Sequence, residues 1–143
     1  MYTGLQHLHS AFAYLLLAVL LFAIIYNLIG YLGKKPFSET NRKVALIGLI
    51  ASHLQLVIGL ILYFVSPMGL SNFSGPNMKD SVSRLYMLEH PLTMIIGIVL
   101  VTIGYSKAKK LTDSNARYRK ILIFFTLGLI LMLVRIPWQA WLD

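Results

Sequence analysis

The chain contains no cysteine and few charged residues. Only 13% of its 143 residues are charged, against about a quarter in a typical soluble domain. Without cysteine, disulfides, iron–sulfur clusters and thiolate chemistry are excluded, so any metal must be held by histidine, methionine or carboxylate. The hydrophobic share of 57% and the mean hydropathy of +0.72 are instead typical of a protein that crosses a membrane several times.

Acidic residues are especially scarce. Five Asp and Glu stand against 13 Lys and Arg, which gives a formal net charge of +8. Such a charge can indicate a nucleic-acid-binding protein, but here the basic residues lie between hydrophobic segments. We therefore predict no nucleic-acid partner and interpret the basic residues as topology signals and contacts with lipid headgroups.

Four segments are long and apolar enough for membrane-spanning helices, which need about 20 mostly apolar residues. They cover residues 8–32, 44–65, 85–105 and 121–141. The first is not expected to be a cleaved signal peptide, because no Lys or Arg precedes it and its apolar run is too long. Short connections make consecutive helices antiparallel neighbours. The sequence predicts one all-α domain over residues 1–143, an integral membrane antiparallel four-helix bundle.

The basic residues predict the orientation of this bundle. Only three lie at one side of the predicted spans, Lys79, Arg84 and Arg135. The first and third connections carry ten, namely Lys34, Lys35, Arg42, Lys43, Lys107, Lys109, Lys110, Arg117, Arg119 and Lys120. By the positive-inside rule these connections face the cytoplasm, and both termini face the outer, periplasmic side. We expect a multi-pass protein of the cell inner membrane, surrounded by the lipid bilayer.

Histidines inside the predicted spans mark the candidate site, because ionisable side chains within a bilayer are costly and by default functional. His9 lies near the outer end of the first span. His90 lies about 9 Å inside the third span at 1.5 Å per residue. Arg135 lies in the same half of the fourth span, whereas His53 is the deepest histidine, near the middle of the second. His7 is expected to be only an interfacial residue.

Two histidines at one depth on different helices suit the axial ligation of haem, because imidazole binds iron through a ring nitrogen and bundle cores hold such cofactors. We predict haem b as the cofactor, with His9 and His90 as metal ligands. His53 is a further cofactor-binding candidate, or it hydrogen-bonds another helix. Arg135 either pairs with a haem propionate or extends to the outer headgroups. Zinc is less consistent with the sequence, because a structural zinc needs about four ligands.

Two further residues are predicted to bind the cofactor. Met94 and Gly97 follow His90 by one and two helical turns and lie on nearly the same face. Gly104 continues this stripe two turns later. A histidine above a glycine stripe leaves a slot for a flat cofactor. In the alternative interpretation, the two glycines only allow neighbouring helices to pack closely.

The triplet Glu89-His90-Pro91 combines an acid, an imidazole and a helix breaker. Pro91 has no N–H for the carbonyl of Met87, which predicts either a kink or the start of the helix. Glu89 points about 100° away from His90 on a helix. It is therefore expected to form a salt bridge, with Arg84 or Arg135, rather than a hydrogen bond to the imidazole.

Three segments resemble spans of haem A synthase. They read LQHLHSAFAYLLLAVLL, HLQLVIGLILYFVSPMGL and SVSRLYMLEHPLTMIIG, and together they cover roughly residues 5–105. In that family the first and third of these spans each carry a ligand histidine. The resemblance implies a four-helix bundle like one half of haem A synthase, with haem held by His9 and His90. The opening MYTGLQHLHS also resembles small bacterial membrane proteins described as cytochrome b-like.

The sequence departs from haem A synthase at a catalytic position. The catalytic half of that enzyme has a glutamate three residues before the first ligand histidine, where Gln6 stands in this chain. The full enzyme also has more spans. The resemblance therefore implies the haem-holding role rather than the catalytic step.

The predicted function is electron transfer by a membrane b-type cytochrome in a respiratory or quinone-linked chain. Ligation by two histidines closes both axial positions of the iron, which favours electron transfer over oxygen chemistry. Two alternatives stay open, a cofactor-free small membrane subunit or adaptor of a larger complex, and a half-sized haem A synthase-like enzyme acting as a homodimer. The expected partners are accordingly a larger membrane complex or a second copy, together with a quinone.

Overall fold

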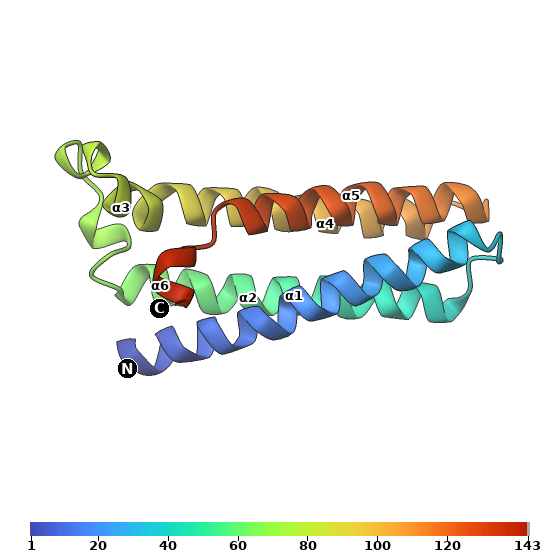
Figure 1. The fold of residues 1–143 in the computed structure, drawn as a ribbon, viewed down its shortest axis with the longest axis horizontal. Helices are drawn as coiled ribbons and strands as arrows, with labels where there is room; N and C mark the ends of the chain where they lie inside the picture. Colours follow the sequence, from blue (N-terminus) through green and yellow to red (C-terminus); the bar gives the residue numbers. More distant parts are fainter. Residues whose placement is uncertain (143) are drawn as a thin grey trace.

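The computed structural model describes residues 1–142, and this part of the chain is helical with no β-strand. The all-α prediction is confirmed. Four long helices lie side by side along the long axis of the molecule (Figure 1), and they are α1 (Tyr2–Leu32), α2 (Glu39–Val65), α4 (His90–Lys110) and α5 (Ser114–Val134). Consecutive long helices run in opposite directions, so both ends of the chain lie at the same end of the molecule (Figure 1).

Each long helix packs against two others. The pairs in contact are α1 with α2, α4 with α5, α1 with α5, and α2 with α4. Leu20, Val101 and Phe125, from three of these helices, have no exposed surface and form the centre of the core. The outward faces are also apolar, since large side chains such as Phe22 and Phe64 are more than half exposed.

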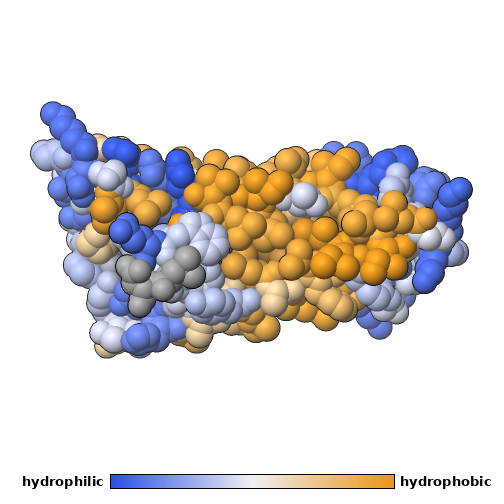
Figure 2. Space-filling view, in the orientation of Figure 1, coloured by the Kyte–Doolittle hydropathy of each residue, from blue (hydrophilic) through white to orange (hydrophobic). Residues whose placement is uncertain are grey.

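Three helical segments are long and apolar enough to cross a membrane, and they are Tyr2–Leu32, Glu39–Val65 and Ser81–Lys110. They contain the first three predicted spans. On the face shown in Figure 2, hydrophobic side chains form a band across the middle of the molecule, and hydrophilic side chains gather at both ends. This distribution matches a protein whose surface faces lipid hydrocarbon in the middle and water at the ends.

Helix α5 differs from the fourth predicted span. Arg117, Arg119 and Lys120 lie in its first two turns, and α5 is not among the segments found long and apolar enough to cross a membrane. It ends at Val134, whereas the prediction ended at residue 141. After a turn containing Pro137, the short helix α6 (Trp138–Leu142) folds back toward α1 (Figure 1).

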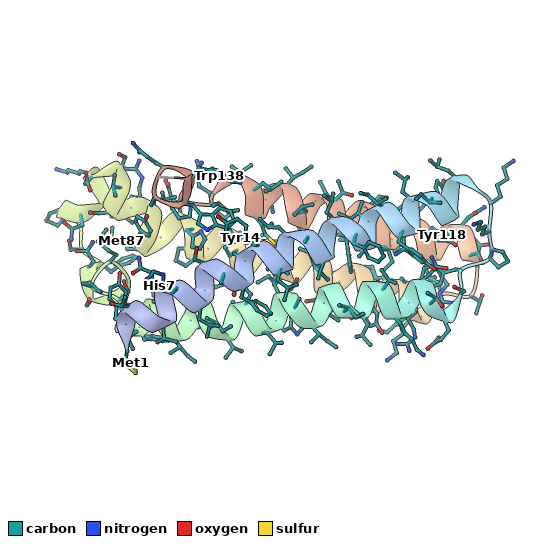
Figure 3. All side chains as sticks on the ribbon, turned by 60° about the horizontal axis from the view of Figure 1, so that its bottom comes forward. Met1, His7, Tyr14, Met87, Tyr118 and Trp138 are labelled. Atoms are coloured by element: carbon teal, nitrogen blue, oxygen red, sulfur yellow. The ribbon has the colours of Figure 1, made fainter. Side chains whose placement is uncertain are left out.

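The end of the molecule opposite the termini is closed by buried polar side chains. Asn41 donates to the side chain of Asn27, and the hydroxyl of Tyr118 donates to Asn41. Asn41 also completes a capping box with Ser38 at the start of α2. Figure 3 places Tyr118 at the end opposite to His7 and Met87. These groups satisfy one another, so the helices are closely packed at this end.

The chain is less regular at the other end. Between α2 and α4 it forms the short helices η1 (Leu70–Asn72), η2 (Pro76–Lys79) and α3 (Ser81–Arg84), followed by the π-helical turn η3 (Leu85–Glu89). The carboxylate of Asp80 caps α3 by accepting the N–H of Ser83, and this hydrogen bond lowers the pKa of the Asp80 carboxyl.

Candidate functional site

A cavity of about 590 Å³ lies at the end of the molecule where the two termini meet. This volume is within the range of roughly 300–1,000 Å³ found for small-molecule and cofactor sites. Its walls come mainly from the first half of α1, the second half of α2 with the residues that follow it, the first three turns of α4, and the end of α5 with the segment after it. Among the described residues that line it there is no Lys, Arg, Asp or Glu. The cavity therefore suits a largely apolar ligand whose charged groups, if any, lie outside it.

His9 of α1 and His90 of α4 lie together in this cavity. Their ring centroids are 6.1 Å apart and their planes are nearly perpendicular, at 88°. The residues are 81 positions apart in the chain, and the antiparallel packing of the helices places both in the same half of the molecule. The structure thus brings together the two residues that the sequence predicted as metal ligands.

The hydrogen bond of His90 determines which of its nitrogens is free. The Nδ1 atom of His90 lies 2.8 Å from the backbone oxygen of Arg135. A carbonyl oxygen only accepts, so Nδ1 carries the proton and donates, and Nε2 keeps its lone pair. Metal-binding histidines show this arrangement, in which the second ring nitrogen donates to a carbonyl or carboxylate.

A π-helical turn precedes His90 and affects its position. The N–H of His90 donates to the carbonyl of Leu85, five residues earlier, instead of four as in an α-helix. Pro91 follows in the first turn of α4 and supplies no N–H to the carbonyl of Met87. The hydroxyl of Tyr63 donates to that carbonyl at 2.7 Å. Such π turns are frequent at functional sites, and here the turn places an imidazole against the cavity.

Helix α2 holds His9 through two residues that were not predicted as site residues. The side-chain nitrogen of Gln55 donates to the backbone oxygen of His9 at 2.7 Å. One turn later, Gly59 packs against the imidazole, and a Cβ atom on Gly59 would lie 3.0 Å from the Cε1 atom of His9. The Nδ1 atom of His9 and the Oε1 atom of Gln55 are buried, and neither has a hydrogen-bond partner within residues 1–142.

A sequence signal for these residues exists. Gln55, Gly59 and Tyr63 recur every fourth residue along α2, so they form one stripe that faces the cavity. The stripe contains a polar, a small and an aromatic side chain within a strongly apolar helix. Polar, small or aromatic residues that recur every fourth position in an otherwise apolar span therefore predict a face that lines a cavity.

The predicted glycine slot is not present. A Cβ atom on Gly97 would lie 3.0 Å from the backbone oxygen of Gly128 in α5. Gly104 similarly packs against Phe124 of α5. Contrary to the prediction of a cofactor contact, Gly97 lies at the interface between α4 and α5, as the alternative interpretation proposed. Met94 lines the cavity, and its contact with a cofactor stays a prediction.

His53 lies outside the cavity, on the exposed side of α2. Its Nε2 atom is 2.9 Å from the hydroxyl oxygen of Thr102 in α4. That hydroxyl donates to the backbone oxygen of Ile98, so His53 is the donor in the bond to Thr102. His53 thus forms the hydrogen bond between two helices that the alternative interpretation expected, and it does not line the cavity.

Arg135 contributes its backbone rather than its side chain. Its Nε atom lies 3.7 Å from Glu89, and its side chain is not part of the cavity lining. Glu89 also accepts from Arg84 at 3.0 Å, so it pairs with both predicted arginines. The contact between Arg135 and a bound propionate stays a prediction. The carbonyl that orients His90 could not be selected from the sequence, because every residue has one.

Residues 1–142 contain no group of three or more His, Cys, Asp or Glu side chains that could hold a metal ion. A site between His9 and His90 therefore supplies two protein ligands. This number is too small for a structural zinc, which needs about four. It equals the number of axial positions that a protein fills in a six-coordinate haem iron.

Comparison with known protein families, with curated proteins and with solved structures gives no match to this chain. The geometry of the cavity and its two histidines is therefore the basis of the functional proposal.

Proposed function

We propose that the protein is a membrane b-type cytochrome that holds haem b between its helices and transfers electrons in a respiratory or quinone-linked chain. His9 and His90 are its axial ligands. The observation that carries this proposal is the approach of these two rings to 6.1 Å between centroids inside a cavity of about 590 Å³.

The arrangement of the residues fits this cofactor. Two imidazoles on opposite sides of one metal ion have ring centroids roughly 6 Å apart, because each metal–nitrogen bond is about 2 Å long. His90 presents an unprotonated Nε2, because its Nδ1 donates to a carbonyl. Bound haem would supply a one-electron couple at its iron, and closing both axial positions favours electron transfer.

The protein residues then have distinct tasks. The carbonyl of Arg135 orients the ring of His90, and Gly59 leaves space for the ring of His9. Apolar side chains such as Met94 and Ile98 keep water from the interior of the site. Because the lining offers no cation, it would hold the apolar part of a haem and would not neutralise its two carboxylates.

We also propose that the chain is an integral antiparallel four-helix bundle of the cell inner membrane, with α5 as its fourth span and both termini on the periplasmic side. Membrane spanning is supported by three segments of suitable length and apolarity and by the hydrophobic band in Figure 2. The orientation is supported by the concentration of Lys and Arg in two connections.

A visible spectrum tests the cytochrome proposal. The protein is expressed in haem-replete cells and purified in mild detergent, and its oxidised and dithionite-reduced spectra are recorded. We expect a Soret band that shifts on reduction. His9→Ala and His90→Ala should each abolish it, whereas the matched variant His53→Ala, at a histidine outside the cavity, should retain it. A folded wild-type protein without a Soret band after haem supplementation would contradict the proposal.

One observation favours a second candidate, a neutral quinone in the same cavity. The uncharged lining suits a lipid-soluble ring, and the free Nε2 of His90 can accept a hydrogen bond from a quinol hydroxyl. Quinone found in lipid extracts of the purified protein, together with no Soret band, would favour this candidate over the cytochrome.

A further inference from the structure

The two cavity histidines are held differently. The Nδ1 atom of His90 has a partner, the carbonyl of Arg135. Within residues 1–142, the Nδ1 atom of His9 is buried without one, and so is the Oε1 atom of Gln55. An amide oxygen only accepts, whereas an imidazole nitrogen donates when it carries the proton. The two unpaired atoms are therefore chemically complementary.

The position of Gln55 makes a pairing feasible. Its Nε2 atom donates to the backbone oxygen of His9, which determines which end of the amide is the nitrogen and leaves Oε1 as the free end. Gly59 lies one turn further along the same face of α2 and contacts the imidazole of His9. The amide of Gln55 and the ring of His9 thus both lie at the contact between α1 and α2.

We propose that Gln55 is the positioning residue for His9. Its Oε1 accepts the proton on Nδ1 of His9, either directly after a small side-chain rotation or through one buried water. His9 then has the same tautomer as His90, and each ring presents an unprotonated Nε2 to the cavity. The inference rests on the proposed haem site, since a histidine that bound iron through Nε2 would need the lone pair of that atom.

The tautomer can be measured without haem. The ring ¹⁵N chemical shifts of the haem-free protein in detergent micelles, at an alkaline pH where the imidazoles are neutral, report which nitrogen carries the proton. His7→Gln and His53→Gln variants assign the signals. We expect His9 and His90 both to carry the proton on Nδ1. In Gln55→Leu, the proton of His9 should move predominantly to Nε2, while the signals of His90 stay unchanged and show that the fold is intact.

Two further variants separate this role from a merely structural one. Gln55→Glu should restore the Nδ1–H form of His9, because a carboxylate also accepts. Gln6→Leu removes another glutamine of the same cavity that makes no hydrogen bond to His9, so it should leave the tautomer unchanged. In haem titrations, Gln55→Leu should weaken binding about 10–100-fold, as for other residues that orient metal ligands.

The result that overturns the inference is a wild-type His9 with its proton on Nε2, or a tautomer that Gln55→Leu leaves unchanged. Neither depends on bound haem. A protein that fails to bind haem but shows the expected tautomers would contradict the proposed function and support the role of Gln55.

Discussion

At the scale of single residues, Tyr63 supplies a hydrogen bond that Pro91 removes. A proline within a helical segment leaves the carbonyl four residues earlier without its usual donor. Here that carbonyl belongs to Met87, and the hydroxyl of Tyr63 reaches it from α2. The contact joins α2 to the turn that leads into His90. It lets the chain keep a break in its helical bonding next to a candidate ligand without an unsatisfied group in the membrane.

The variant Tyr63→Phe tests whether the hydroxyl of Tyr63 replaces the backbone N–H that Pro91 lacks. We expect the free energy of unfolding to fall by about 1–3 kcal/mol, because a partly buried carbonyl loses its partner. Denaturation in detergent, followed by circular dichroism, measures the change. In a Pro91→Ala background the backbone N–H of residue 91 is available, so Tyr63→Phe should cost less there. An equal cost in both backgrounds would show that the two residues are not coupled.

Gly59 is the second residue whose size matters for the site. A Cβ atom there would lie 3.0 Å from the ring of His9, so Gly59→Val should displace the imidazole. We expect the variant to fold but to lose most of its haem absorbance. Gly4→Val is the matched control, because Gly4 is also helical and a Cβ atom on it would have no neighbouring atom within 4 Å. Retention of the wild-type spectrum by Gly59→Val would argue against His9 as a ligand.

At the scale of elements, α4 and α5 form the closest helix pair. A Cβ atom on Gly128 would lie 2.7 Å from the backbone oxygen of Gly97 and 2.9 Å from the side chain of Val101. Small residues at such contacts let two backbones approach, and in a membrane this packing drives helix association. The glycines of α4 therefore serve the connection to α5, and the cavity is formed on another face of α4.

Gly128→Ala should disturb this pair. The added methyl group meets a backbone oxygen that cannot move aside, so the helices must separate. We expect a loss of about 1–3 kcal/mol, the usual cost of overpacking, measured as a lower thermal midpoint in detergent. Gly4→Ala adds the same methyl group to an open helical position and should be neutral or stabilising by up to about 1 kcal/mol. Equal midpoints for the two variants would contradict the close contact.

The helices were predictable from the sequence to different degrees. The first three spans have long apolar runs, so local composition is sufficient to predict them. The end of α5 was predicted too far along the chain, because apolar residues continue on both sides of Arg135, although Pro137 is a local signal of a break. The chain turns back there because Trp141 donates to the hydroxyl of Ser10 at 2.7 Å and stacks on Tyr14, with ring centroids 4.2 Å apart. Such contacts between distant residues leave no local pattern.

The site was predictable to a similar extent. His9 and His90 follow from depth, which is a property of each span taken alone. The roles of Gln55, Gly59 and Tyr63 depend on which face of α2 meets α1 and α4. Gly97 was predicted to line a cofactor slot but lies between two helices. Close helix packing and a slot for a flat cofactor both require a small residue, so the sequence pattern does not distinguish them.

At the scale of the whole molecule, the proposed topology is directly testable because the chain has no cysteine. Single cysteines are introduced in intact cells at Asn77, in the loop before α3, and at Lys109, near the end of α4. A membrane-impermeant maleimide should label Asn77→Cys in spheroplasts and Lys109→Cys only after the membrane is permeabilised. The reverse pattern would place both termini in the cytoplasm.

The cavity lies at one end of the molecule, and the opposite end is closed by Asn27, Asn41 and Tyr118. A redox centre in that cavity receives and releases electrons at a single membrane surface. Moving one elementary charge across the full membrane changes its free energy by about 2.3 kcal/mol per 100 mV of membrane potential. An electron that enters and leaves on the same side undergoes almost no such change. Turnover of the proposed cytochrome would therefore be electrically silent, and its rate in vesicles should not change when a membrane voltage is imposed.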